Sequence, residues 1–162
     1  MSEALKKSRT IDALLAEYGQ SHQNPFNKKI HWIAVPVIFW TVLALLWSIP
    51  VPAAFNLVPM LNWATILLGL TVLYYAVLSP TLAIGMALFA AFCIFLVQLF
   101  EQFISLPLWQ GALIIFVIAW IFQFWGHKVE GKKPSFFKDV QFLLIGPAWL
   151  MSFIYQRLGI KY

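Results

Sequence analysis

Three histidines are the residues of this chain best suited to chemistry. His22 lies in the loop before the first long apolar run, His31 lies at the start of that run, and His127 lies just after the fourth. Four membrane crossings return a chain to the side from which it set out, so the three imidazoles can meet at one membrane face. Imidazole binds zinc, iron, copper and nickel well. The pattern favours a metal site at that face, although polar residues also collect at interfaces without binding anything.

Polar side chains around His127 would support such a site. Gln123 precedes His127 by four residues and Glu130 follows it by three, so a continued helix would place all three on one stripe. Amides and carboxylates commonly orient a ligating imidazole, and we predict that role, or proton relay, for Glu130 and Gln123. Two alternatives for Glu130 stay open. It could itself bind the metal, as carboxylates do in non-heme Fe(II) oxygenases, or it could be a solvated carboxylate paired with Lys128 or Lys132.

Two asparagines stand near the other histidines. Asn24 follows His22 by two residues. Asn27 lies four residues before His31, on the same helix face if the helix starts early enough. We include Asn24 and Asn27 among the catalytic candidates. Turn formation and helix capping, for which asparagine is well suited, are the alternative roles.

The composition is that of an integral membrane protein. Hydrophobic residues make up 62% of the 162 residues and charged residues 10%, whereas a globular domain is roughly half apolar and a quarter charged. So few charges cannot cover a water-facing surface, and most of the outside must therefore face lipid. The single cysteine, Cys93, lies in an apolar stretch and offers neither a disulfide framework nor a CxxC metal site. Residues 1–29 lack the apolar core of a secretory signal.

Four apolar runs are long enough to cross the hydrocarbon core, which takes about 20 helical residues. They cover residues 32–49, 61–79, 81–100 and 107–125. Residues 10–18 precede them as a short amphipathic helix that would lie at the interface. A fifth, shorter run at 140–155 carries Gly146-Pro147 near its middle, which favours a re-entrant or interfacial helical hairpin; five full crossings are the alternative. The predicted fold class is an all-α membrane protein with four transmembrane helices, an N-terminal amphipathic helix and a C-terminal re-entrant or interfacial helical segment.

We treat residues 1–162 as one integral-membrane domain, with a cytoplasmic helix and loop at 1–29, the spans at 30–125, and a metal-site loop and final helix at 126–162. Basic residues gather on one side of the spans. They are Lys6, Lys7, Arg9, Lys28 and Lys29 before the first run, and Lys128, Lys132, Lys133 and Lys138 after the fourth. The positive-inside rule places that side, and the metal site, in the cytoplasm. The membrane would be the bacterial inner membrane, or the endoplasmic reticulum in a eukaryote. Anionic lipid headgroups account for these cations better than nucleic acid does.

Several enzyme classes are excluded by motif. HExxH, GxSxG and phosphate-binding glycine loops are absent, and three histidines cannot build the HxxxH and HxxHH boxes of membrane desaturases. Two classes of other function remain open. A small metal or proton transporter would place ionisable residues at mid-span, where this sequence has essentially none. A structural membrane protein would have no need of clustered histidines.

The segments around the histidines resemble those of a known family. The first is YGQSHQNPFNKKIH at residues 18–31, followed by Pro36; the second comprises Gln123, Gly126, His127, Glu130 and Pro134, with Gly146-Pro147 further on. They are similar to the Y…HxNPxNxxIHxxGxP and Q…GH…E…P signatures of the Mpo-like, or yeast-type, 2-hydroxy fatty acid dioxygenases. Ala34 and Ser135 stand where those signatures have glycine and alanine, and neither change removes a ligand.

The resemblance implies an integral-membrane Fe(II) enzyme of fatty acid α-oxidation. Its activity would be the oxidative shortening of 2-hydroxy fatty acids by one carbon with O₂. Fe(II) would be held by His22, His31 and His127, with open positions for O₂ and for the carboxylate and 2-hydroxyl of the substrate. The partners would be the 2-hydroxy fatty acid, O₂ and the lipid bilayer, without nucleic acid.

Overall fold

The computed structural model describes residues 10–131 and 136–162, and within the second range it describes side chains from residue 143 onward. These residues form helices joined by short loops and contain no strand. In chain order the elements are α1 (Thr10–Gln20), α2 (Pro25–Trp47), the short 3-10 helix η1 (Ala53–Leu57), α3 (Trp63–Leu78), α4 (Pro80–Phe103), α5 (Leu108–Glu130) and α6 (Phe136–Arg157). The expected all-α fold is confirmed. Among the residues named above, Lys6, Lys7, Arg9, Lys132, Lys133, Pro134 and Ser135 lie outside the described residues.

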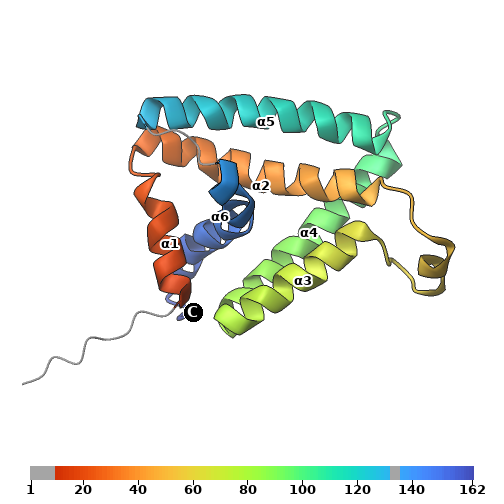
Figure 1. Cartoon of the computed structure of the whole chain (residues 1–162), viewed down its shortest axis with the longest axis horizontal. Coiled ribbons are helices and arrows are strands. Elements are labelled where there is room, and N and C mark those ends of the chain that lie inside the picture. The colour runs from red at the N-terminus through yellow and green to blue at the C-terminus, as the bar shows by residue number, and fades with distance from the viewer. Residues whose placement is uncertain (1–9, 132–135) are drawn as a thin grey trace, which may run out of the picture.

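Two helix pairs form the body of the molecule. α2 and α5 lie side by side and run in opposite directions (Figure 1). α3 and α4 form the second pair, joined by a tight turn, and this pair diverges from α2 toward the end where α2 begins. α6 contacts both α2 and α4, and α1 packs against α6. The end of α1, the start of α2 and the end of α5 therefore meet at one corner (Figure 1).

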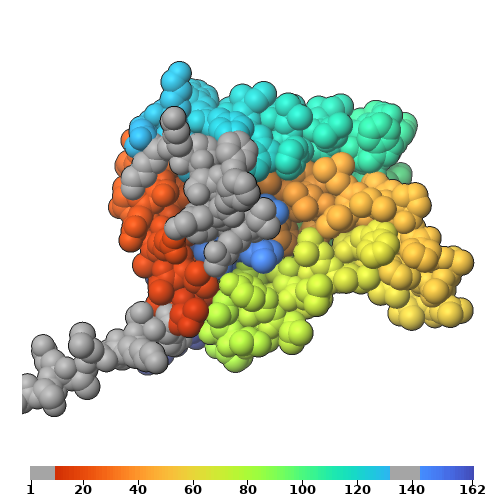
Figure 2. Space-filling view, in the orientation of Figure 1, coloured from red at the N-terminus to blue at the C-terminus, as the bar shows by residue number. Residues whose placement is uncertain are grey.

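Among the described residues, three helices are long and apolar enough to cross a membrane, namely α2, α4 and α5. α3, which corresponds to the second expected span, is apolar but has only 16 residues. That length gives about 24 Å, less than the roughly 30 Å of the hydrocarbon core, so the expected count of four spans is not confirmed. Val77, Leu88 and Ile121 are examples of large apolar side chains exposed on α3, α4 and α5, as a lipid-facing surface requires. Figure 2 shows α5 and α3 at opposite edges of the molecule.

α2 begins before the first apolar run does. Asn24 caps it, because its side-chain oxygen accepts the N–H of Phe26 at 2.8 Å, which satisfies one of the free donors of a helix start. Pro25 takes the first helical position, where its fixed φ suits the helix and its missing N–H costs nothing. His31 therefore lies on α2 itself.

α5 ends after the fourth apolar run does. The helix continues to Glu130 and is closed by Gly131, whose φ of 73° lies in the left-handed region that glycine adopts readily. His127 and Glu130 consequently lie on the last turn of a helix and not in a loop after it. A rigid helix end thus positions both side chains.

α1 packs its apolar face against α6. Ile11, Leu15 and Tyr18 are buried and belong to the same core cluster as Ile145 and Trp149 of α6. The amphipathic helix expected at this end of the chain is present, but its apolar side contacts protein. Because α6 also contacts α2, this packing fixes the direction of α1 relative to α2.

α6 is one continuous helix, so the helical hairpin expected at Gly146-Pro147 is wrong. A proline removes a single backbone donor, and helices surrounded by other helices tolerate that loss. α6 contacts α1, α2 and α4, and Tyr75 of α3 donates its hydroxyl to the carbonyl of Leu144. Contacts on several sides hold this segment as a helix despite the proline.

Candidate metal centre

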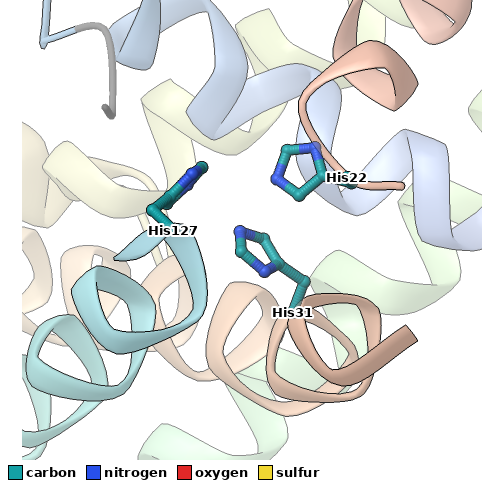
Figure 3. Close-up of side chains that lie close together, drawn as sticks. All are labelled: His22, His31 and His127. Atoms are coloured by element: carbon teal, nitrogen blue, oxygen red, sulfur yellow. The ribbon is translucent and has the colours of Figure 1, made fainter. Parts of the chain in front are cut away.

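The three histidines meet where α1, α2 and α5 come together (Figure 3). His22 lies in the turn after α1, His31 on α2 and His127 on α5, and the three rings point toward one another. All are buried, with exposed fractions of 3%, 0% and 8% in that order. Their possible ligand atoms all lie within 4.8 Å of one another. The turn after α1 and the adjacent start of α2, together with the distant end of α5, thus place one imidazole each in a single buried cluster.

Two of the imidazoles are held by a carbonyl one helical turn earlier. Nδ1 of His22 lies 2.6 Å from the carbonyl oxygen of Tyr18, and Nδ1 of His31 lies 2.9 Å from that of Asn27. A carbonyl can only accept, so these bonds require the proton on Nδ1, and the lone pair is then on Nε2. A backbone carbonyl bonded to one ring nitrogen is a usual partner of a metal-binding histidine. Both rings are therefore prepared to offer Nε2 as a ligand.

The buried nitrogens of this cluster fit a metal ion. Nε2 of His31 and Nδ1 of His127 have no hydrogen-bond partner among the described residues, and buried polar atoms seldom stay unsatisfied. Ring centroids are 4.1 Å apart for His22 and His31, 5.1 Å for His31 and His127, and 5.4 Å for His22 and His127. Nitrogens about 2.0–2.1 Å from one ion lie at most about 4.2 Å apart, so small ring shifts would close the cluster around an ion. Imidazole donors suit a divalent transition metal.

Glu130 anchors the turn that carries His22. Its Oε1 accepts the backbone N–H of Gln23 at 2.8 Å. Its Oε2 accepts the backbone N–H of Asn24 at 2.9 Å and the side-chain amide of Asn27 at 3.1 Å. Bonds to a charged acceptor are roughly twice as strong as neutral ones. Of the roles left open for Glu130, these bonds favour positioning, because both carboxylate oxygens are engaged by the turn and by α2.

Asn27 connects α2 to the other parts of the site. Its side chain is fully buried, and Nδ2 donates to the carbonyl of Ser21 at 3.3 Å as well as to Glu130. Its Oδ1 lies so close to Gly126 of α5 that a Cβ at residue 126 would overlap it. Glycine at 126 therefore allows α5 to approach α2 at the level of the histidines.

Asn24 and Gln123, the other two predicted site residues, have different surroundings. Asn24 caps α2 with its side chain and bonds Glu130 through its backbone, which is the capping role left open beside a catalytic one. Gln123 is buried on α5 one turn before His127. Its Oε1 has no hydrogen-bond partner in the described part of the chain, so this oxygen is available to a polar group of a ligand.

Two aromatic residues beside His22 were not predicted as part of the site. The ring of Tyr18 stacks on the imidazole of His22, with centroids 4.2 Å apart and planes at 13°. The ring of Trp149 lies 5.4 Å from the same imidazole. The spacing of four residues between Tyr18 and His22 could have indicated the first contact. No local signal links Trp149 to residue 22, since that contact depends on how α6 packs.

The sequence of this chain is similar to that of a known protein family. The family model described as 2-hydroxy-palmitic acid dioxygenase Mpo1-like matches residues 8–158. The 2-hydroxy-palmitic acid dioxygenase MPO1 of Saccharomyces cerevisiae is 29% identical to this chain over 147 residues, which cover 90% of the chain and 79% of the yeast protein. No solved structure matches. Because the family match includes all of the helices and the three clustered histidines, this chain belongs to the Mpo1-like family.

Proposed function

We propose that this protein is an Fe(II)-dependent dioxygenase that cleaves 2-hydroxy fatty acids to fatty acids one carbon shorter at the membrane surface. The observation that carries the proposal is the buried cluster of His22, His31 and His127, whose ligand atoms lie within 4.8 Å of one another. Membership of the family and the name of the yeast relative support the substrate class. The apolar helices support a lipid environment in which such a substrate dissolves.

The three histidines would hold the metal. Three protein ligands leave coordination positions open, as a catalytic site requires. When bound, Fe(II) supplies the redox chemistry that lets O₂ react with an organic substrate. The contribution of the chain is to fix the rings, which the carbonyls of Tyr18 and Asn27 do for His22 and His31.

Two further residues have proposed roles, one inferred from the hydrogen bonds it makes and the other from an acceptor atom without a partner among the described residues. Glu130 positions His22, because it holds the backbone of Gln23 directly after that histidine. Gln123 would accept the 2-hydroxyl hydrogen of the substrate, because its buried Oε1 has no partner among the described residues and an amide oxygen is a good acceptor. Neither residue needs to be a metal ligand for these roles.

An apolar groove supports binding of an acyl chain. It has a volume of about 580 Å³, and its lining includes Pro36 and Trp40 of α2 with Phe89 and Phe100 of α4. Pro36 follows His31 by five residues, which is about 7.5 Å along the helix axis. Each methylene buried there would contribute about 0.8 kcal/mol. A polar head at the histidines and a long chain in this groove would suit a 2-hydroxy fatty acid.

The test uses purified protein loaded with Fe(II) without oxygen and then supplied with 2-hydroxypalmitate and O₂. The proposal expects bound iron, consumption of O₂ and a fatty acid product with one carbon fewer. His22→Ala, His31→Ala and His127→Ala should each lose both the iron and the activity. Lys29→Gln, which removes an exposed cation of α2, is the control and should keep both.

Zinc-loaded protein is the matched control for the identity of the metal, because zinc binds imidazole but has no redox chemistry. It should be folded and inactive. Full activity with zinc alone, activity without any metal, or unchanged iron content in the three histidine variants would exclude the proposal.

A further inference from the structure

A second groove lies between the start of α2 and the end of α6. It has a volume of about 880 Å³. Two cations, Lys28 and Arg157, line it together with the apolar side chains of Trp32, Phe153, Ile154 and Leu158. No acidic side chain is among the described residues that line it. The groove thus combines positive charge with apolar walls.

The two cations have no partner of opposite charge within the described structure. Lys28 is half-buried and Arg157 is exposed, and neither makes a salt bridge or a side-chain hydrogen bond with another described residue. Two cations that line one groove attract an anion, and the planar arginine head can bond both oxygens of a carboxylate. The charge of the groove therefore indicates an anionic ligand.

The walls restrict which anion fits. A small hydrated ion gains nothing from Trp32, Phe153 and Leu158, because apolar surface stabilises only a ligand that buries apolar surface of its own. An amphiphile with an anionic head and a hydrocarbon chain satisfies both parts of the groove. A fatty acid is the simplest such molecule.

Aromatic side chains connect this groove to the metal centre. Trp32 directly follows His31 on α2. Phe153 packs edge-on against Trp149 with ring centroids 4.8 Å apart, and Trp149 lies 5.4 Å from the ring of His22. A ligand in the groove would therefore lie next to the site at which the proposed reaction occurs.

The two grooves have neighbouring lining residues on α2. Trp32 of the charged groove and Pro36 of the apolar groove are four residues apart, which places them one above the other on the helix surface. An acyl chain whose head is held at Lys28 can pass Trp32 and continue toward Pro36. An acyl chain in this position could belong to a fatty acid whose carboxylate lies at the charged groove or to one whose carboxylate lies at the histidines.

We propose that Lys28 and Arg157 bind the carboxylate of a fatty acid, with its chain running past Trp32 toward Pro36. The choice of a fatty acid rests on the proposed function, but binding itself requires neither metal nor turnover. Substrate and product both carry a carboxylate on a hydrocarbon chain, and they differ in the 2-hydroxyl and in one carbon of chain length. The groove recognises what they share, so it holds the substrate before reaction or the product after it.

The test measures binding of palmitate, which lacks the 2-hydroxyl, to the metal-free protein in an uncharged detergent by titration calorimetry. Wild-type protein should bind it saturably. The double variant Lys28→Gln/Arg157→Gln should bind about tenfold more weakly, because charge-assisted bonds to the carboxylate are lost. Lys28→Arg/Arg157→Lys, which keeps both charges, should bind nearly as tightly as wild type.

Lys29→Gln/Lys161→Gln is the matched control, because it removes two exposed cations that do not line the groove. It should bind palmitate as wild type does. Equal affinity of wild type and Lys28→Gln/Arg157→Gln, or an equal loss in the control, would overturn the proposal. If the double variant does not fold, the single variant Arg157→Gln, whose change lies at an exposed position, takes its place. It should bind palmitate more weakly than wild type does, and equal affinity would overturn the proposal.

Phosphatidylglycerol added to the same micelles tests the other source of an anionic head. It should not displace palmitate; displacement at equal or lower concentration would reassign the groove to phospholipid and overturn the proposal. The outcome of this binding measurement does not depend on the outcome of the turnover assay. A protein without dioxygenase activity whose palmitate binding still depends on Lys28 and Arg157 would keep this site and lose the proposed function.

Discussion

The carboxylate of Glu130 at the end of α5 accepts a hydrogen bond from the side-chain amide of Asn27 on α2, at 3.1 Å and across 103 residues of sequence. The same carboxylate accepts the backbone N–H groups of Gln23 and Asn24. One charged group therefore joins the ends of two helices to the turn that carries His22. A site whose ligands come from three segments needs such a connection, because small displacements of a ligand weaken binding.

Replacing Glu130 with glutamine should weaken metal binding by about tenfold, which lies within the range for groups that hold a ligating histidine. Glutamine keeps the shape of the side chain but loses the charge and one of the two acceptor oxygens. The measurement is the metal retained against a graded series of chelator concentrations. A loss as complete as that in His127→Ala would make Glu130 a ligand, and unchanged retention would remove its positioning role.

Replacing Gly126 with alanine should destabilise the protein by about 1–3 kcal/mol, the usual cost of overpacking, and should also lower its metal affinity. The added methyl group would overlap Oδ1 of Asn27 and displace a partner of Glu130. Gly69→Ala on α3 is the control, because no atom lies within 4 Å of its added Cβ. Denaturation in detergent and chelator titration measure the two effects. Equal behaviour of the two variants would contradict the close approach of α2 and α5.

The parts of the site that sequence could predict are those with a local signal. The position of each histidine beside an apolar run indicated which end of the helices it occupies, and spacings of three and four residues placed Gln123 and Glu130 on the face of His127. That Glu130 bonds the turn at Gln23 could not be predicted, because it depends on where α5 ends and how the turn folds. The contact of Trp149 with His22 is non-local for the same reason.

Where each helix begins, ends or breaks likewise depends on local sequence signals in some places and on tertiary packing in others. Apolar runs mark contact with lipid or core, whereas capping residues decide where a helix begins and ends. Asn24 and Gly131 therefore extend α2 and α5 beyond their runs, and a capping box between Asn62 and Thr65 starts α3 late within its run. The expected break at Pro147 failed because packing around α6 outweighs the local preference of proline.

Replacing Tyr75 with phenylalanine should destabilise the fold by about 1 kcal/mol, the typical net value of one hydrogen bond. The hydroxyl of Tyr75 joins α3 to α6 at the carbonyl of Leu144, while the ring itself would stay in place. Tyr74→Phe is the control, because Tyr74 is only half-buried and makes no hydrogen bond with another described residue. Thermal unfolding should separate the two variants. Equal melting temperatures would show that this bond does not hold α6.

Metal binding should stabilise the fold, since an ion that binds only the native state adds about 2.7 kcal/mol when present at 100 times its Kd. His22 lies in the turn after α1, so the ion would join that turn to α2 and α5. Thermal unfolding with and without a chelator should show a higher Tm for the metal-loaded protein, and limited proteolysis should show protection at residues 21–24. His22→Ala should fold but lose both effects, because it no longer retains the ion, whereas Lys29→Gln should keep them. An equal shift of Tm in wild type and His22→Ala would place the ion elsewhere in the protein.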